Sequence, residues 1–177
     1  MEKKIAIECL STPDDPGYPD KVVVTTNGEM LFHSPAGACP NPREPWLKGG
    51  RPWPQAYGWL GLGSYTYEAV YSRKRGLWLV LDGGGRVASR TPNPRHDGLR
   101  YLAGVGLHRG WTADWRGSAG CLTIPPSAWG DFVSLFTVGD RGELHVLDFH
   151  PRRYEAVADQ CKRASVCPMF ETVGGIL

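Results

Sequence analysis

Glycine and proline recur so often along this 177-residue chain, 23 and 15 times, that they limit the folds open to it. Glycine in a helix costs backbone entropy, and proline removes a hydrogen-bond donor and clashes with the preceding turn. The segments between them are short and rich in β-branched and aromatic residues. The pattern excludes a helical bundle and predicts a mainly β protein with one or two short helices.

Alternating and apolar segments locate the expected strands. A hairpin is predicted at Asn27-Gly28, a dipeptide typical of two-residue β-turns, which follows the β-branched run of residues 22–26. Alternation or continuous apolar character predicts further strands over residues 63–71, 76–82, 104–108 and 142–150. The three glycines of residues 83–85 are interpreted as a plain turn, because no Lys-Ser/Thr and helix follow to form a phosphate-binding loop.

One helix is predicted after the two prolines at 125 and 126, with Ser127 as its N-cap and Gly139 at its end. Its apolar face follows helical spacing and comprises Trp129, Phe132, Val133 and Phe136. The tail over residues 151–177 is expected to be helical, with no assigned role. Because no repeat or composition shift marks a boundary, we expect one domain over residues 1–177.

Charge and hydropathy limit the kinds of partner that the chain can bind. A net charge of +2 and a pI near 8.3, with dispersed basic residues, do not favour nucleic-acid binding. The densest basic run, Arg73-Lys74-Arg75, precedes Gly76 and is interpreted as a solvated turn. No segment approaches the roughly 18 apolar residues of a membrane span, and the N-terminal residues lack a secretory-signal core. We therefore expect cytoplasmic synthesis without a signal peptide and no membrane span.

The five cysteines do not have the spacing of a metal site. They comprise Cys9, Cys39, Cys121, Cys161 and Cys167, with no C-x-x-C pair among them. We expect no metal and no cofactor. The odd number leaves at least one thiol unpaired within a monomer, and which of the others pair stays open.

Cys121 and the upstream His108 form a candidate catalytic pair. A cysteine nucleophile must be held as thiolate, and a neighbouring histidine can take its proton. His108 ends a predicted strand, and thirteen residues can return the chain to bring Cys121 beside it. Gly120 allows the sharp turn that would point amides at a developing oxyanion. The spacing alone equally fits a buried structural cysteine with an unrelated histidine.

The residues around Cys121 resemble a known active-site segment. Ser118-Ala119-Gly120-Cys121-Leu122-Thr123, followed by "IPPSAWGDF", resembles that of the L,D-transpeptidase catalytic domain family. The chain is more similar still to a divergent branch in phage-encoded and phage-like proteins, with a pattern near "HRGG…SxGCQTIPPxQWxxF". The strong match covers about thirty residues. The family usually has a second histidine where Ala119 stands, and Arg or Asn where Thr123 stands.

The resemblance implies a β-sandwich or barrel with its core over about residues 20–150. It also implies Cys121 as nucleophile, His108 as base, Ser118 as the residue that shapes the turn, and the Gly120 and Cys121 amides as the oxyanion hole. The residues it offers for substrate binding are Arg109, Arg116, Trp111, Trp115 and Thr123. Both arginines are also compatible with solvated loops, and the tryptophans with ordinary packing. Of the remaining histidines, His33, His145 and His150 are expected to be structural. His96, followed by Asp97, is compatible with a second histidine of the pocket, and the favoured interpretation is a loop residue without a role.

The function implied is cysteine-dependent acyl transfer on peptidoglycan stem peptides, as transpeptidase, carboxypeptidase or exchange with free D-amino acids. Without a signal peptide, the expected route to the periplasm or cell wall is lysis, a phage particle or a secretion apparatus. An antibacterial effector, which would have an immunity protein as partner, fits this route. Two alternatives stay open: a non-catalytic phage-like structural or cell-wall-binding module, and a cysteine protease or amidase acting on proteins.

Overall fold

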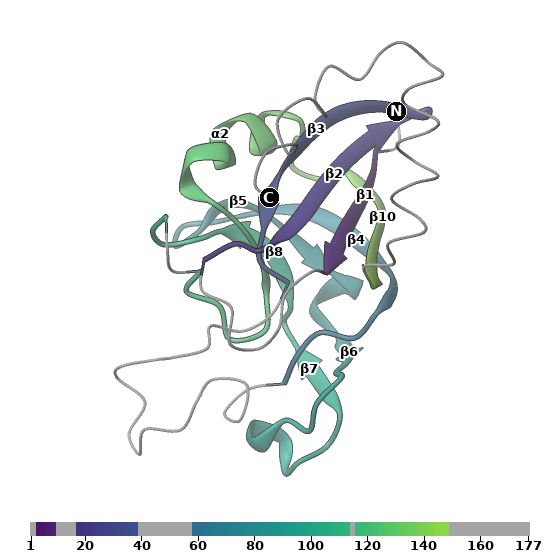
Figure 1. Cartoon of the computed structure of the whole chain (residues 1–177), viewed down its shortest axis with the longest axis vertical. Helices are drawn as coiled ribbons and strands as arrows, with labels where there is room; N and C mark the ends of the chain where they lie inside the picture. The colour runs from purple at the N-terminus through teal and green to yellow at the C-terminus, as the bar shows by residue number, and fades with distance from the viewer. Residues whose placement is uncertain (1–2, 10–16, 39–57, 114–115, 149–177) are drawn as a thin grey trace, which may run out of the picture.

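The computed structural model describes residues 3–9, 17–38, 58–113 and 116–148, which form an eight-stranded sheet, a two-stranded sheet and one α-helix (Figure 1). The strand order in the large sheet is β3-β2-β1-β10-β4-β5-β8-β9, and β6 pairs with β7. The elements are β1 Lys3–Cys9, β2 Asp20–Thr26, β3 Glu29–Ala36, β4 Gly63–Ser72, β5 Gly76–Leu81, η1 Asp82–Gly84, β6 Arg86–Ala88, η2 Pro94–His96, β7 Tyr101–Ala103, β8 Gly106–Arg109, β9 Leu122–Ile124, α2 Pro126–Ser134 and β10 Arg141–Asp148.

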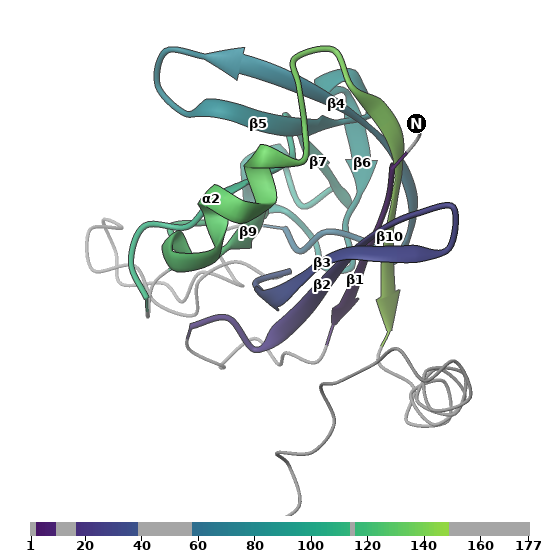
Figure 2. The ribbon, with the colours of Figure 1, turned by 90° about the horizontal axis from the view of Figure 1, so that it is seen from above.

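The large sheet curves until its two outer strands meet. Gly37, just after β3, exchanges two backbone hydrogen bonds with Thr123 of β9, at N···O distances of 2.8 and 2.9 Å. We call this Gly37–Thr123 contact the closing seam. It turns the sheet into a nearly closed barrel, and in Figure 2 the strands curve round a common interior with α2 between β5 and β3. The mainly β, single-domain fold with one short α-helix is thus confirmed, in its barrel form.

Alternation along the strands fills the barrel interior, as the sequence predicts. In β4, Tyr65, Tyr67 and Ala69 are buried, and the last member of that face, Tyr71, lies exposed at the end of the strand. The helix α2 contributes Phe132, which is fully buried and packs edge-on against Phe32 with ring centroids 5.5 Å apart. These contacts anchor the helix that directly follows β9.

The hairpin predicted at Asn27-Gly28 joins β2 to β3. Both residues have positive φ, +50° and +83°, as this turn requires. The helix differs from its prediction: α2 begins at Pro126, and Pro125 occupies the N-cap position without a side-chain hydrogen bond. Ser127 lies inside the first turn instead, because Pro126 takes the first helical position, where the fixed φ of proline is favourable. The helix also ends earlier than expected, at Ser134 rather than near Gly139.

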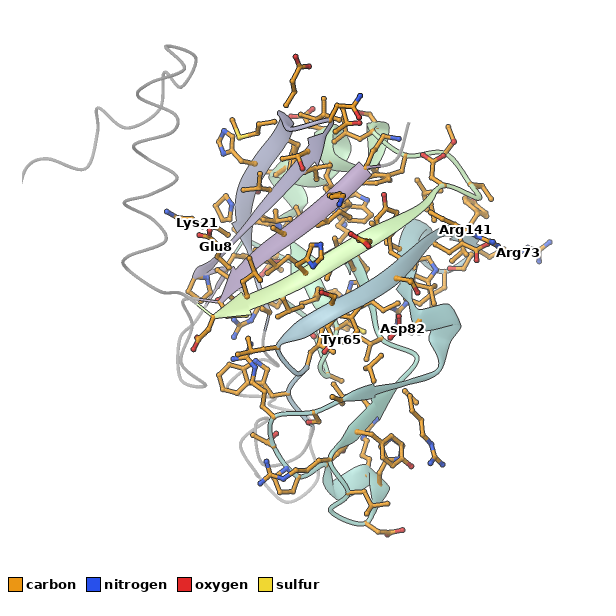
Figure 3. All side chains as sticks on the ribbon, turned by 90° about the vertical axis from the view of Figure 1, so that its right-hand side faces the viewer. Glu8, Lys21, Tyr65, Arg73, Asp82 and Arg141 are labelled. Atoms are coloured by element: carbon orange, nitrogen blue, oxygen red, sulfur yellow. The ribbon has the colours of Figure 1, made fainter. Side chains whose placement is uncertain are left out.

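The core begins before the expected residue 20. Strand β1 lies inside the sheet, antiparallel to β2 and parallel to β10, and its Ile5 and Ile7 are fully buried. Figure 3 shows β1, β10 and β4 running side by side across the barrel wall. The early segment was not expected there because a parallel partner more than a hundred residues away leaves no local signal. The expected tail helix lies outside the described residues.

Among the residues that the structure describes, no helix combines the length and apolar character needed to cross a membrane.

Candidate active site

Cys121 and His108 are brought together by a parallel pair of strands. β8 and β9 run parallel with Leu107 opposite Leu122, so Cys121, one residue before β9, lies beside Gly106. Gly106 and His108 share one face of β8, because alternate residues of a strand point the same way. The His108 side chain is largely buried at 8% exposure, and Cys121 is partly exposed. The pair lies next to the closing seam, since Cys121 is two residues before Thr123.

The His108 ring is held in one orientation by the backbone. Its Nδ1 lies 2.8 Å from the carbonyl oxygen of Arg109. A carbonyl oxygen only accepts hydrogen bonds, so Nδ1 carries the hydrogen in the neutral ring. The other nitrogen, Nε2, is then the one that can take a proton from the Cys121 thiol, with which the imidazole forms a hydrogen bond.

The surroundings of Cys121 favour its thiolate. Burial is the largest single influence and raises the pKa of the thiol, but it is outweighed by several opposing interactions. These are the hydrogen bond with His108, the positive charge of the imidazolium, a backbone hydrogen bond from Gly106 and the positive charge of Arg75. The net effect lowers the pKa below the ordinary thiol value of 9.0. A lowered pKa increases the fraction of nucleophile at neutral pH.

Ser118 holds the turn that presents the cysteine. Its side chain is fully buried, and its Oγ donates to the Cys121 carbonyl oxygen at 2.5 Å while accepting from the Gly120 N–H at 3.1 Å. One hydroxyl therefore satisfies two backbone groups of a four-residue turn. The Gly120 N–H, which was expected to help form the oxyanion hole, instead donates to Ser118 Oγ.

Gly120 must be glycine for two independent reasons. Its φ of +121° is a conformation that side chains with a Cβ rarely adopt. A Cβ at this position would also lie 3.0 Å from the Gly58 carbonyl oxygen and 3.3 Å from the Leu102 side chain. The β7 residue Leu102 thus packs directly behind the turn, which fixes the position of the residue that follows, Cys121.

Two of the residues offered for substrate binding lie on the surface. Arg109 is exposed at the end of β8, on the strand face opposite to His108. Trp111 is 59% exposed, and its indole covers Gly117, where a Cβ would come within 2.5 Å of the ring. Arg109 and Trp111 therefore place a guanidinium and an aromatic surface at the end of β8 and in the loop that follows it. Trp115 lies outside the described residues.

The other two, Arg116 and Thr123, are buried at the closing seam. Arg116 is 1% exposed, and its Cδ occupies the space where Gly37 lacks a side chain. Thr123 has no exposed surface, and its Oγ1 lies 3.4 Å from the Gly37 carbonyl oxygen. In this conformation both side chains support the seam behind the site, and a substrate could contact them only after a rearrangement.

Arg75 was missed as a site residue by sequence reasoning. The turn between β4 and β5 that carries it is solvent-exposed, as expected for a charged run. Its guanidinium nevertheless lies 4.6 Å from the centre of the Trp78 ring, and its charge acts on Cys121. No local sequence pattern could show that Arg75 lies near Cys121, because their proximity depends on the pairing of β5 with β8.

Three other histidines lie in the described ranges, two of them with contacts to other side chains. His96 stacks on Tyr101 with ring centroids 4.3 Å apart, and His145 contacts Ser64 through Nδ1 at 2.8 Å. His33 is exposed on β3. Within the described ranges, no group of three or more His, Cys, Asp or Glu side chains is placed to hold a metal ion. His150, Cys39, Cys161 and Cys167 lie outside those ranges.

Comparison with known proteins found no matching family model and no matching curated protein. A crystal structure of an L,D-transpeptidase (Yku) from Stackebrandtia nassauensis is similar at a TM-score of 0.45 and 15% identity. The match covers 85% of this chain and 58% of that chain, so this chain spans little more than half of its length.

Proposed function

We propose that the protein is a cysteine acyltransferase acting on peptidoglycan stem peptides, with Cys121 as nucleophile and His108 as base. The observation that carries the proposal is the pairing of a lowered-pKa thiol with an imidazole whose Nδ1 is committed to a backbone carbonyl. A histidine held in this way can take a proton at Nε2 and return it. The substrate class comes from the resemblance of residues 108–136 to L,D-transpeptidase active-site segments.

The proposed reaction has two steps. In the first, Nε2 of His108 takes the thiol proton while Cys121 Sγ attacks the carbonyl carbon of the third stem residue. The tetrahedral intermediate collapses to a thioester, and the amine of the fourth, D-configured residue leaves with the proton from His108. In the second step, water or an amine attacks the thioester carbonyl carbon and gives a proton to Nε2 of His108. The bond between that carbon and Sγ then breaks, and His108 returns the proton to Sγ.

The oxyanion formed in each step needs backbone donors. The Gly120 N–H is used by Ser118, so we assign this role to the N–H of Cys121 itself. Gly120 contributes by its φ, which sets the direction of the next amide. Ser118 acts on the geometry of the turn, since its hydroxyl is committed to the backbone on both sides.

Peptide contacts are assigned to exposed residues at the end of β8 and in the loop that follows it. Trp111 presents an apolar wall, and Arg109 has a guanidinium that suits carboxylate binding. The acceptor decides whether the product is a trimmed peptide, an exchanged D-amino acid or a cross-link. We further propose that the protein acts on the cell wall, as a phage-like protein or an antibacterial effector.

Muropeptide analysis tests this proposal. Purified tetrapeptide and cross-linked muropeptides are incubated with the wild-type protein and with Cys121→Ala, and the products are identified by liquid chromatography and mass spectrometry. Trimming or exchange at the fourth residue by the wild type alone supports L,D-acyl transfer. Unchanged muropeptides, together with cleavage of protein substrates, would instead support a cysteine protease or amidase.

The exposed Trp111 favours a second candidate, a non-catalytic module that binds the cell wall by stacking on sugars. The two candidates differ in which residue they need. Sedimentation with purified peptidoglycan should depend on Trp111, and be indifferent to Cys121→Ala, if the binding module is correct. Acyl transfer requires turnover that disappears in Cys121→Ala.

A further inference from the structure

The turn between β4 and β5 carries Arg75, whose guanidinium stacks on a tryptophan near Cys121. Arg75 stacks on Trp78 with its guanidinium carbon 4.6 Å from the ring centre, and its backbone N–H is anchored by Ser72 Oγ at 3.1 Å. The ion pairs among the described residues use Lys3, Lys4, Arg141 and His145 as cations. Within the described part of the chain, the guanidinium of Arg75 is thus held in place by an aromatic ring and faces no carboxylate.

Trp78 connects this arginine to the nucleophile. β5 and β8 pair with Val80 opposite Gly106, so alternation places Trp78 on the same face as Gly106 and His108. The indole lies directly over Gly106, where a Cβ would be 2.5 Å from the ring. Gly106 in turn lies beside Cys121 and contributes a backbone hydrogen bond to it. The sequence of contacts from Arg75 through Trp78 and Gly106 to Cys121 is continuous.

We propose that Arg75 binds a carboxylate of the acyl donor next to the scissile amide, and so selects peptides with a free carboxylate at that point. For a stem tetrapeptide this is the carboxylate of the fourth, leaving residue. A guanidinium offers two parallel N–H donors to a carboxylate, and stacking on Trp78 limits its freedom before the substrate arrives. The identity of the substrate rests on the proposed function, whereas recognition of its carboxylate rests on the placement of Arg75 and Trp78.

The other arginines near the site fit this role less well. Arg116 is buried at the closing seam, and Arg109 leaves β8 on the face opposite to His108. Thr123 stands where the resembling family has Arg or Asn, and it is buried as well. Arg75 is carried by the β4–β5 turn and stacks on Trp78, which lies on the same strand face as His108. Its guanidinium therefore supplies positive charge on the side of the sheet where Cys121 and His108 meet.

Two small alkylating reagents test the recognition without any peptidoglycan. Iodoacetate and iodoacetamide both transfer a two-carbon group to a thiolate with loss of iodide, but iodoacetate carries a carboxylate. Their rate constants at Cys121 are measured by peptide mass mapping in the wild type, in Arg75→Gln and in Arg73→Gln. Arg73 is the matched control, since it is exposed in the same turn and projects from the barrel in Figure 3. The ratio of the two rate constants cancels any change in the thiol pKa.

We expect the iodoacetate-to-iodoacetamide ratio to fall about two- to fivefold in Arg75→Gln, to stay unchanged in Arg73→Gln, and to fall in the wild type as salt is added. Equal ratios in all three proteins would overturn the role of Arg75. If muropeptides are turned over, the wild type should process a tetrapeptide amidated at the fourth residue more slowly than one with a free carboxylate there. Arg75→Gln should process the two at similar rates. A fall in the ratio without any muropeptide turnover would support carboxylate recognition by Arg75 and reject the stem-peptide substrate.

Discussion

Two cysteines at strand ends, Cys9 and Cys121, show how neighbours decide what a thiol can do. Cys9 closes β1, is 4% exposed, and receives a contact from the Arg90 guanidinium at 3.0 Å. Cys121 precedes β9, is partly exposed, and meets His108. Both thiols thus face a nitrogen group that can carry positive charge.

The two partners differ in whether they can accept a proton. A guanidinium stays protonated at all ordinary pH values, so Arg90 can stabilise negative charge at Cys9 without serving as a base. An imidazole with Nδ1 bonded to a carbonyl has Nε2 available to accept the thiol proton and return it. Burial adds to the contrast, since a substrate carbonyl cannot reach Cys9. Of these two thiols, Cys121 alone therefore combines proton transfer with access to a substrate.

The largest expected effect comes from removing the base. His108→Gln keeps a polar side chain of similar size but cannot take the thiol proton, so Cys121-dependent turnover should fall about 10²- to 10⁴-fold. Cys9→Ala, the matched change at the other thiol, should leave turnover intact. Steady-state assays with muropeptides measure both. Equal losses of turnover in His108→Gln and Cys9→Ala would contradict the claim that only one of the two thiols takes part in the reaction.

Gly120→Ala should destabilise the fold and stop turnover. The positive φ alone costs about 1–3 kcal/mol, and the Gly58 and Leu102 contacts add to it. Gly139→Ala is the control, because Gly139 has a φ of +91° but no atom within 4 Å of its Cβ position. Denaturant unfolding should show the larger loss for Gly120→Ala. A folded Gly120→Ala protein with full activity would contradict the role assigned to the turn.

Ser118→Ala leaves two backbone groups of the turn without their side-chain partner. We expect a loss of about 1–3 kcal/mol in the free energy of unfolding and slower alkylation of Cys121 by iodoacetamide. Ser34→Ala removes another buried hydroxyl, which donates to the Pro35 carbonyl oxygen on β3, and should leave the alkylation rate unchanged. If both variants alkylate like the wild type, Ser118 does not shape the nucleophile.

The smallest effect is electrostatic. Alkylation of Cys121 should rise with pH and reach a plateau with a midpoint below the ordinary thiol pKa of 9.0, since the folded protein favours the thiolate. Arg75→Gln should raise that midpoint by less than about one pH unit, because Arg75 is exposed and screened by solvent. Arg73→Gln should not move it. A wild-type midpoint at or above 9.0 would contradict the lowered pKa.

Local patterns in the sequence were enough to predict the β-hairpin at Asn27-Gly28 and most strands, because turn type and alternation depend on neighbouring residues. The position of β1 was not predictable, since its parallel partner β10 lies at the other end of the described chain. For the same reason, the place of Arg75 beside Cys121 needed the β5–β8 register.

The pairing of Cys121 with His108 was proposed from spacing and a short resemblance, and its place in the fold follows from the β8–β9 pairing. Sequence reasoning could not show that Arg116 is buried, because arginine is usually a surface residue and the space it fills is created by a distant glycine, Gly37. Nor could it show that Ser118 uses the Gly120 amide, which depends on the conformation of the turn.

The central claim is that Cys121 forms a thioester with a stem peptide, and intact-protein mass spectrometry tests it most directly. The protein is incubated with tetrapeptide muropeptide, quenched in acid and mapped by peptide digestion. We expect a mass increase equal to the mass of the donor minus that of the released fourth amino acid, located on Cys121, absent in Cys121→Ala and retained in Cys9→Ala. No adduct and unchanged muropeptide, from folded protein whose Cys121 reacts with iodoacetamide, would contradict it.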